Sequence, residues 1–341
     1  MKKLNSKLIP ISFSALLLAL LFSCTKRETT ASFYYWQTNF SLNQIEKQAL
    51  SELHCQEVYV RLFDIDIKND SIVPLGVIKN LDSFPSNLQL IPVVFITNRT
   101  FIETKPENIK HLAVNTHNKI TSLLKLANKT CKKIQIDCDW SQGTKHNYFQ
   151  FLKQFKAIDT NIILSSTIRL HQVKYPTITG IPPVDEGTIM YYNMGKLKGS
   201  ENSIYNSNDA NKYIESIAYY PLKCNIALPI FSWGKVERES KIINLINNTD
   251  SLLFEKKEQL LQLDSITYKV KSSFLYKGIY FKENDVMKME QTSVDELMLA
   301  AKGLAENLKQ DSIKIIFFDL NSTNLNYYSN EKLKDILNAF N

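Results

Sequence analysis

The stretch KIQIDCDWS, residues 133–141, decides the fold, because it joins a β-rich run to carboxylates at the run's end. A polar loop and then a helical stretch, His146–Lys156, follow it. We predict a strand over Lys133–Asp139. Residues two apart on a strand share a face, so Asp137 and Asp139 are expected to point together. Two such carboxylates suit acid–base work, cation binding or an ion pair with Arg99 or Arg169.

The same rhythm of strand, loop and helix recurs on both sides of this stretch. Most of the predicted strands are continuous apolar runs, which is typical of strands covered on both faces. They are Ser32–Thr38, Glu57–Phe63, Leu88–Thr97, Lys133–Asp139, Asn161–Ile168, Thr188–Asn193, Cys224–Ser232 and Ser312–Asp319. The predicted helices are Leu42–Leu53, Glu107–Cys131, His146–Lys156, Asp209–Tyr220, Val294–Leu308 and Asn330–Phe340. The fifth helix is missing, because Tyr175–Val184 holds three prolines and is expected to be mostly loop.

Eight strands that alternate with helices predict an α/β fold with a parallel sheet, and eight strands close a (β/α)8 TIM barrel. An open doubly wound sheet is the alternative. More than fifty residues, 235–292, separate the seventh strand from the seventh helix and include strand-like runs at Ile266–Lys271 and Gly278–Lys282. We expect one barrel domain over residues 32–341, with a small α+β insertion at 235–292.

Composition limits the classes of function. The chain has 341 residues and a net charge of +7, of which three charges lie before residue 24. A remainder of +4, without a block of Lys or Arg, predicts no nucleic-acid partner. Four cysteines follow residue 24, at Cys55, Cys131, Cys138 and Cys224, and no CxxC motif occurs. We therefore expect buried thiols, no metal site and no cofactor, although pairing into disulfides remains open.

The first residues resemble a bacterial lipoprotein leader. Basic residues precede an apolar run over residues 8–22, which is short for a membrane span and suits a signal peptide. The run ends at Cys24, so residues 1–23 are expected to be removed, Cys24 lipidated, and 24–31 left as a linker. The resemblance implies anchoring to the outer membrane, with the periplasmic side favoured. An ordinary secretory leader or a short membrane anchor is the alternative.

Polar and aromatic side chains gather where the predicted strands end. In a TIM barrel the active site lies at this carboxyl-terminal face. The candidates, counting Trp36 at the end of the first strand, are Trp36, Asp64, Asp66, Asn98, Arg99, Asp137, Asp139, Arg169, His171, Tyr192, Asn193, Trp233 and Asp319. Trp140 follows Asp139 directly, so it is expected to face a helix, in the core.

Three of these strand ends resemble the motifs of family-eighteen glycoside hydrolases, the chitinases and endo-β-N-acetylglucosaminidases. Residues 136–141, IDCDWS, look like the end of their DxxDxDxE signature. Residues 188–193, TIMYYN, resemble their M-x-Y-D/N motif. Residues 227–234, ALPIFSWG, resemble a G-x-P-x-Y-G stretch of the same enzymes. Uncharacterised bacterial barrels with a D-x-D motif are also similar. The resemblance implies that Asp139 and Asp137 are the catalytic pair and that Tyr192 and Asn193 hold a substrate acetamido group.

The resemblance fails at the proton donor. The family's general acid, a glutamate, falls on Ser141, and the first aspartate falls on Ile134. A serine hydroxyl has no useful acidity for this step. Three readings stay open: a glycosidase whose acid is Asp64, Asp66, Glu186, Glu237 or Asp319; a non-catalytic binder of a glycan or peptidoglycan; or an envelope scaffold for a protein partner. Substrate contacts are expected from Tyr192, Asn193, Trp233, Trp36, Asp64 and Arg169.

Overall fold

The computed structural model describes residues 27–198, 201–247 and 249–340. The predicted leader and Cys24 lie outside these residues. No helix in the described ranges is both long enough and apolar enough to cross a membrane.

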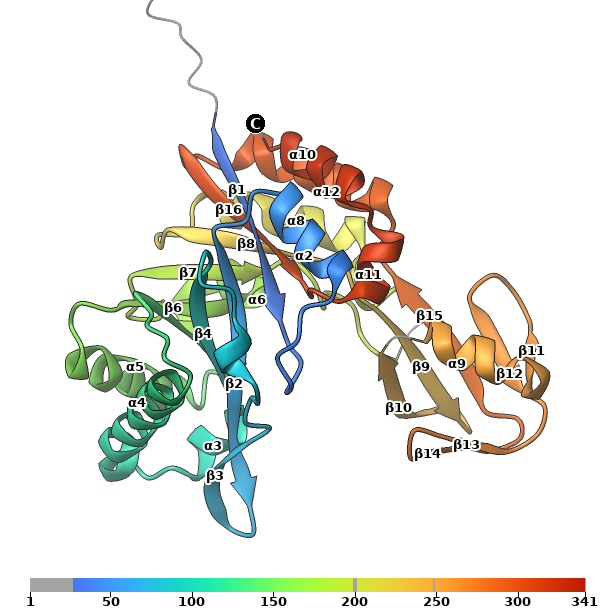
Figure 1. The fold of residues 1–341 in the computed structure, drawn as a ribbon, viewed down its shortest axis with the longest axis horizontal. Coiled ribbons are helices and arrows are strands. Elements are labelled where there is room, and N and C mark those ends of the chain that lie inside the picture. Colours follow the sequence, from blue (N-terminus) through green and yellow to red (C-terminus); the bar gives the residue numbers. More distant parts are fainter. Residues whose placement is uncertain (1–26, 199–200, 248, 341) are drawn as a thin grey trace, which may run out of the picture.

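Eight parallel strands form a closed barrel (Figure 1). They are β1 (Glu28–Tyr35), β2 (Glu57–Lys68), β4 (Gln89–Ile96), β5 (Lys133–Asp137), β6 (Ile163–Arg169), β7 (Glu186–Met190), β8 (Cys224–Pro229) and β16 (Ser312–Phe318). β1 pairs with β16 on one side and with β2 on the other, which closes the sheet. The prediction of a (β/α)8 barrel is confirmed, and an open sheet is excluded.

The second strand is longer than predicted. β2 continues past Phe63 to Lys68 and turns back into β3 (Ser71–Leu75), which pairs with it antiparallel. Asn69 and Asp70, at the turn, both have positive φ, which asparagine and aspartate tolerate better than most residues. The result is a hairpin that projects beyond the barrel wall (Figure 1).

Helices cover the outside of the barrel. They are α2 (Gln44–Glu52), α3 (Asn98–Glu103), α4 (Ile109–Leu126), α5 (Lys145–Ile158), α6 (Leu170–Lys174), α7 (Pro176–Thr179), α8 (Ser207–Ala218), α10 (Val294–Asn307), α11 (Ser322–Tyr327) and α12 (Asn330–Asn338), with 3₁₀ turns at Leu81–Ser83 and Pro106–Asn108. Asn43 and Glu46 cap α2 reciprocally, and Ser293 and Glu296 do the same for α10. After β6 only the short α6 and α7 form, as the prolines predict.

A small antiparallel unit lies between β8 and α10. Its strands are β9 (Ser232–Arg238), β10 (Lys241–Asn247), β11 (Leu260–Gln262), β12 (Thr267–Val270), β13 (Phe274–Tyr276), β14 (Ile279–Phe281) and β15 (Val286–Gln291), with α9 (Asp250–Glu255) and a 3₁₀ turn at Lys257–Gln259. Five strands form a sheet in the order β10-β9-β15-β12-β11, and β13–β14 is a hairpin. This unit has its own apolar core, separate from that of the barrel, and stands to one side of it (Figure 1).

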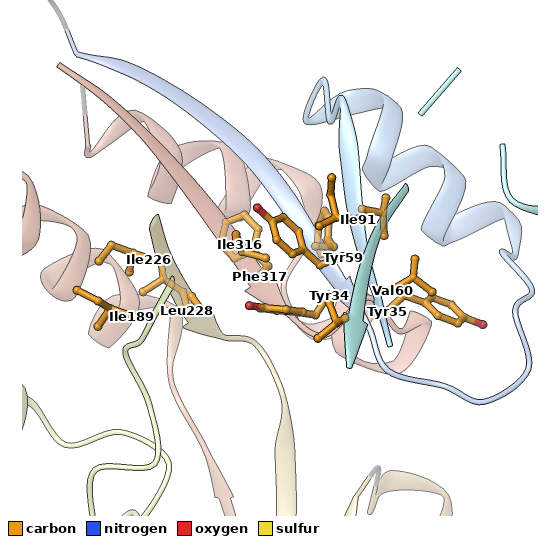
Figure 2. Packing of buried hydrophobic residues seen from close by; sticks show 14 of the residues in the cluster. Tyr34, Tyr35, Tyr59, Val60, Ile91, Ile189, Ile226, Leu228, Ile316 and Phe317 are labelled. Atoms are coloured by element: carbon orange, nitrogen blue, oxygen red, sulfur yellow. The ribbon is translucent and has the colours of Figure 1, made fainter. Parts of the chain in front are cut away.

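A polar bridge crosses the interior of the barrel. Adjacent residues of β1 point to opposite sides, so that Tyr34 faces inward while Tyr35 faces away from it (Figure 2). The Tyr34 hydroxyl donates to Gln135 Oε1 at 2.7 Å, and Gln135 Nε2 donates to Thr188 Oγ1 at 2.9 Å and to Ser165 Oγ at 3.2 Å. The bridge links four strands and satisfies polar groups that water cannot reach.

Arg27 holds the start of β1 against the end of the chain. Its guanidinium donates to the carbonyl oxygens of Gln310 and Phe340, both at 3.0 Å, and to those of Ala305 and Leu308. Because β1 is parallel to its neighbours, its start lies at the amino-terminal end of the barrel, opposite the mouth. Residue 27 therefore leaves the barrel on the side away from the candidate site.

The prediction of buried cysteines is confirmed for three of the four. Cys55, Cys138 and Cys224 are buried free thiols, whereas the free thiol Cys131 is only partly buried. Trp140 is buried as well, and its indole N–H donates to the carbonyl oxygen of Thr179 at 2.9 Å.

We predict that Gln135→Leu lowers the free energy of unfolding by about 1–3 kcal/mol, because it leaves the buried Tyr34 hydroxyl without an acceptor. Denaturant unfolding of Gln135→Leu, Tyr34→Phe and the double variant checks this. The bridge requires that the double variant lose less than the two single variants together. Additive losses would show that the two side chains do not depend on each other.

Candidate functional site

A cavity of about 410 Å³ opens at the carboxyl ends of the barrel strands. Its lining comes from the ends of β1, β5, β7, β8 and β16 and from the antiparallel unit: Trp36, Gln37, Asp137, Met190, Tyr192, Asn193, Phe231, Ser232, Trp233, Asn247, Phe318, Asp319 and Asn321. We call this space the mouth cavity. A second cavity, of about 360 Å³, lies on the outer wall between the β2–β3 hairpin and α4, away from these strand ends.

Aromatic rings form a continuous wall of the mouth cavity. Phe318 is at the centre, with its ring centroid 5.3 Å from that of Trp36, 5.6 Å from that of Tyr192 and 5.5 Å from that of Phe231. Trp233 extends the wall, at 5.4 Å from Phe231. The sequence predicted the positions of Trp36, Tyr192 and Trp233. It gave no comparable signal for Phe231 or Phe318, which read as ordinary apolar strand residues.

Asp137 is the carboxyl at the bottom of the cavity. It ends β5, is 9% exposed, and accepts a hydrogen bond from the Thr167 hydroxyl of β6 at 2.6 Å. Burial raises the pKa of Asp137 to about 7, and the nearby negative charge of Asp139 adds to the rise. The carboxyl therefore changes charge near neutral pH.

Asp139 follows the end of β5 and lies close enough to Asp137 for its negative charge to raise the pKa of that carboxyl. Asp139 is partly exposed and pairs with Arg169, whose Nε lies 3.2 Å from Asp139 Oδ1. Neither residue is among those that line the mouth cavity. The structure thus places them together as an ion pair beside the cavity.

A second carboxyl, Asp319, lines the cavity opposite the end of β5. The side-chain amide of Asn324 donates to its Oδ1 at 2.7 Å. Burial raises the pKa of Asp319 to about 6, and the charge of Glu46 contributes further. Among the five carboxyls considered as a relocated acid, this is the one that lines the mouth cavity.

The other four lie in different surroundings. Asp64 accepts hydrogen bonds from Nε and Nη2 of Arg61, and Asp66 accepts them from the same two atoms of Arg99. The contact between Arg61 and Asp64 depends on an irregularity in β2 between Arg61 and Phe63, which changes the alternation of faces. The last two are in other elements: Glu186 begins β7 and pairs with Lys133 at the far end of the barrel, and Glu237 lies on β9.

Ser141 belongs to a small hydroxyl network. Its backbone N–H donates to Thr144 Oγ1 at 2.9 Å, and its own hydroxyl lies 3.2 Å from that oxygen. The Thr144 hydroxyl donates in turn to Asn98 Oδ1 at 2.5 Å. Ser141 is exposed on the loop between β5 and α5, and this network contains no carboxyl group. Nothing in it can protonate a leaving oxygen.

Two polar residues follow β7 into the cavity. Tyr192 is 7% exposed, and its hydroxyl makes no hydrogen bond within the described ranges. Asn193 has φ of 56°, a left-handed conformation that asparagine tolerates, and its N–H donates to the Ile204 carbonyl oxygen at 2.7 Å. The Tyr192 hydroxyl is therefore available to a ligand.

Trp233 is oriented by a buried ion pair of the antiparallel unit. Its indole N–H donates to Glu290 Oε2 at 2.9 Å. Glu290 pairs with Lys235 at 2.6 Å, and the two side chains are 1% and 0% exposed. The backbone N–H of Ser203 donates to the same carboxylate. Since Ser203 lies in the loop after β7, this network joins the unit to the barrel and fixes one wall of the cavity.

Comparison with known proteins gives a structural match and no sequence match. No family model and no curated protein matches the chain. The spore cortex-lytic enzyme SleL of Bacillus cereus superposes with a TM-score of 0.55 at 13% identity, over 93% of this chain and 75% of its own. A family-eighteen chitinase of Cycas revoluta, in a complex with (GlcNAc)4, superposes with a TM-score of 0.55 at 10% identity, over 92% of this chain and 100% of its own.

The chain has the fold of the family-eighteen chitinases. SleL of Bacillus megaterium agrees, with a TM-score of 0.53 at 13% identity over 90% of this chain and 74% of its own. At these identities the likeness establishes the architecture alone.

We predict that Asp137→Asn stabilises the protein above neutral pH. The pKa of Asp137 is raised in the folded state, so its contribution is favourable at low pH and is lost as pH rises through about 7. The variant should exceed the wild type by about 4 kcal/mol at about pH 8 and come close to it at about pH 4.

Denaturant unfolding at both pH values measures this difference. Asp335→Asn, which removes an exposed carboxyl of α12, is the matched control and should change neither value. If Asp137→Asn were less stable than the wild type at high pH, this would contradict the raised pKa of the buried Asp137 carboxyl.

Proposed function

We propose that the protein binds an N-acetylated glycan in the mouth cavity without cleaving it through residue 141. The observation that carries the proposal is the composition of the cavity: an aromatic wall centred on Phe318 and a few polar groups, of which Asp137 and Tyr192 are the most buried. Aromatic walls with few placed polar groups are typical of small-molecule sites of about 300–1,000 Å³.

Sugars suit such a lining. The C–H faces of a pyranose ring pack on aromatic rings such as Trp36 and Trp233, while its hydroxyl and acetamido groups require hydrogen bonds. Tyr192, which follows β7, and Asn247, which ends β10, both line the cavity and can supply them. The likeness to a chitinase that was solved with (GlcNAc)4 supports the choice of an N-acetylated sugar.

Binding fits the site better than turnover. The place of the family's acid holds Ser141 in a hydroxyl network, and Asp139 is paired with Arg169. A carboxylate in an ion pair with an arginine stabilises a neighbouring positive charge less well than a free one.

Hydrolysis is the second candidate, and one observation favours it. Asp319 lines the same cavity as Asp137, and burial raises its pKa to about 6, so that it keeps its proton at mildly acidic pH. In this reading Asp319 would protonate the glycosidic oxygen. Released oligosaccharide that disappears in Asp319→Asn would favour this candidate over binding alone.

We predict that oligosaccharides of β-1,4-linked N-acetylglucosamine, or peptidoglycan fragments, bind the purified full chain in calorimetric titration. Tyr192→Phe and Trp36→Ala should each weaken binding about tenfold, which is about 1.4 kcal/mol. Tyr219→Phe, on the outer surface at the end of α8, is the matched control and should bind as the wild type does. Absence of heat with every glycan would contradict the proposal and favour a protein partner.

We also propose that Cys24 carries a lipid and that the mouth cavity then faces away from the membrane. Arg27 is three residues beyond Cys24 and is held at the amino-terminal end of the barrel by the carbonyl oxygens of Phe340 and Leu308. The mouth is at the opposite end. Such an orientation suits a receptor for a glycan that lies above the anchoring surface.

The anchor has a direct test in a bacterial host. Cys24→Ala should move the protein from the membrane fraction to the soluble fraction and abolish incorporation of labelled palmitate. Cys131→Ala, at a half-buried thiol of the barrel, is the control and should leave both unchanged. Retention of label by Cys24→Ala would contradict lipidation at this residue.

A further inference from the structure

The carboxylates around the mouth differ in their counter-ions. Asp64 pairs with Arg61, and Asp139 pairs with Arg169, so each of these charges is neutralised beside the cavity. Asp137 and Asp319 accept hydrogen bonds only from the neutral side chains of Thr167 and Asn324 among the described residues. The two carboxyls that line the mouth cavity are thus the two without a basic partner.

The lining contains no compensating charge of its own. Apart from Asp137 and Asp319, its residues are aromatic, apolar or neutral polar, and none is Lys, Arg or His. Tyr192, nine-tenths buried, adds a hydroxyl oxygen that has no partner within the described ranges. Without a cation, burial disfavours the ionised form of both acidic groups, and a cationic ligand in the cavity would favour it again.

The aromatic wall of the mouth cavity also favours a positively charged ligand. The faces of Trp, Tyr and Phe rings attract ammonium and guanidinium groups, by about 0.5–2 kcal/mol for each contact. Trp36 already shows this behaviour toward the protein itself, because the Arg61 guanidinium carbon lies 5.8 Å from its ring centroid. Five rings of this kind surround Asp137 and Asp319.

We propose that the mouth cavity selects a protonated primary amine, as carried by a glycan in which one N-acetylhexosamine has lost its acetyl group. This inference rests on the proposed glycan binding and narrows its substrate class. An ammonium group has three N–H donors and no acceptor, which suits a lining that offers acceptor oxygens from Asp137, Asp319 and Tyr192. An acetamido group in the same place would bring no positive charge to either carboxyl.

The neighbouring charges agree with this assignment. Asp137 is faced by Asp139 and Asp64, whose charges raise its pKa, and by Arg169, which lowers it. Asp319 is faced by Glu46. Since burial raises the pKa of both carboxyls, a bound cation shifts them toward the ionised form and releases protons to the buffer.

Calorimetric titration of the full chain at about pH 6.5, where amino sugars are largely protonated, tests the inference. The probes are a β-1,4-linked N-acetylglucosamine hexasaccharide and the same hexasaccharide with one residue de-N-acetylated. We expect the amine-bearing probe to bind at least about tenfold more tightly and to release protons, seen as a dependence of the heat on the buffer's ionisation enthalpy.

Substitution of each carboxyl by an amide tests whether the negative charge, and not the shape of the side chain, selects the amine. Asp137→Asn and Asp319→Asn keep the volume of each side chain and should each remove most of the tenfold preference. Asp335→Asn, the exposed carboxyl of α12, should keep it. Thermal unfolding of each variant shows that it is folded.

Each outcome decides a separate point. Equal or tighter binding of the fully acetylated probe overturns the inference and leaves the proposed glycan binding in place. A preference that survives both substitutions also overturns it. Failure of both probes to bind the wild type overturns the proposed function together with the inference.

Discussion

The pairing of β1 with both β2 and β16 is the constraint on which the rest of the molecule depends. Once the sheet closes, all eight carboxyl ends meet at one face, and side chains that are far apart in sequence must share one space. Trp36, Asp137, Tyr192 and Phe318 come from four different strand ends and line one cavity for this reason. The bridge from Tyr34 to Gln135 fills the interior beneath them and fixes β1 against β5.

The antiparallel unit completes the mouth rather than merely interrupting the barrel. Its first strand, β9, follows β8 almost directly and carries Trp233. The indole N–H of Trp233 donates a hydrogen bond to Glu290 of β15. The buried pair of Glu290 and Lys235 makes that position rigid, because breaking it would leave a charge without a partner away from water. One wall of the cavity is therefore set by an interaction outside the barrel.

Much of this arrangement could be predicted from the sequence, and the exceptions have local causes. The regular alternation of strands and helices places residues at strand ends, such as Asp137, Tyr192 and Trp233. Several partners of Asp139 were compatible with the sequence, and the fold brings Arg169 to it. The position of Asp64 departs from the regular alternation, because an irregularity in β2 brings it to Arg61. Pairwise contacts of this kind depend on where a strand stops or bulges, which composition and periodicity do not specify.

A crystal structure of the protein soaked with a partly de-N-acetylated N-acetylglucosamine oligosaccharide would show whether the mouth cavity binds an amine-bearing glycan. We expect electron density for a sugar in the mouth cavity, packed against Trp36 or Trp233, with a nitrogen atom within hydrogen-bond distance of Asp137 or Asp319. An empty mouth cavity with the oligosaccharide bound elsewhere, such as between the β2–β3 hairpin and α4, would contradict it.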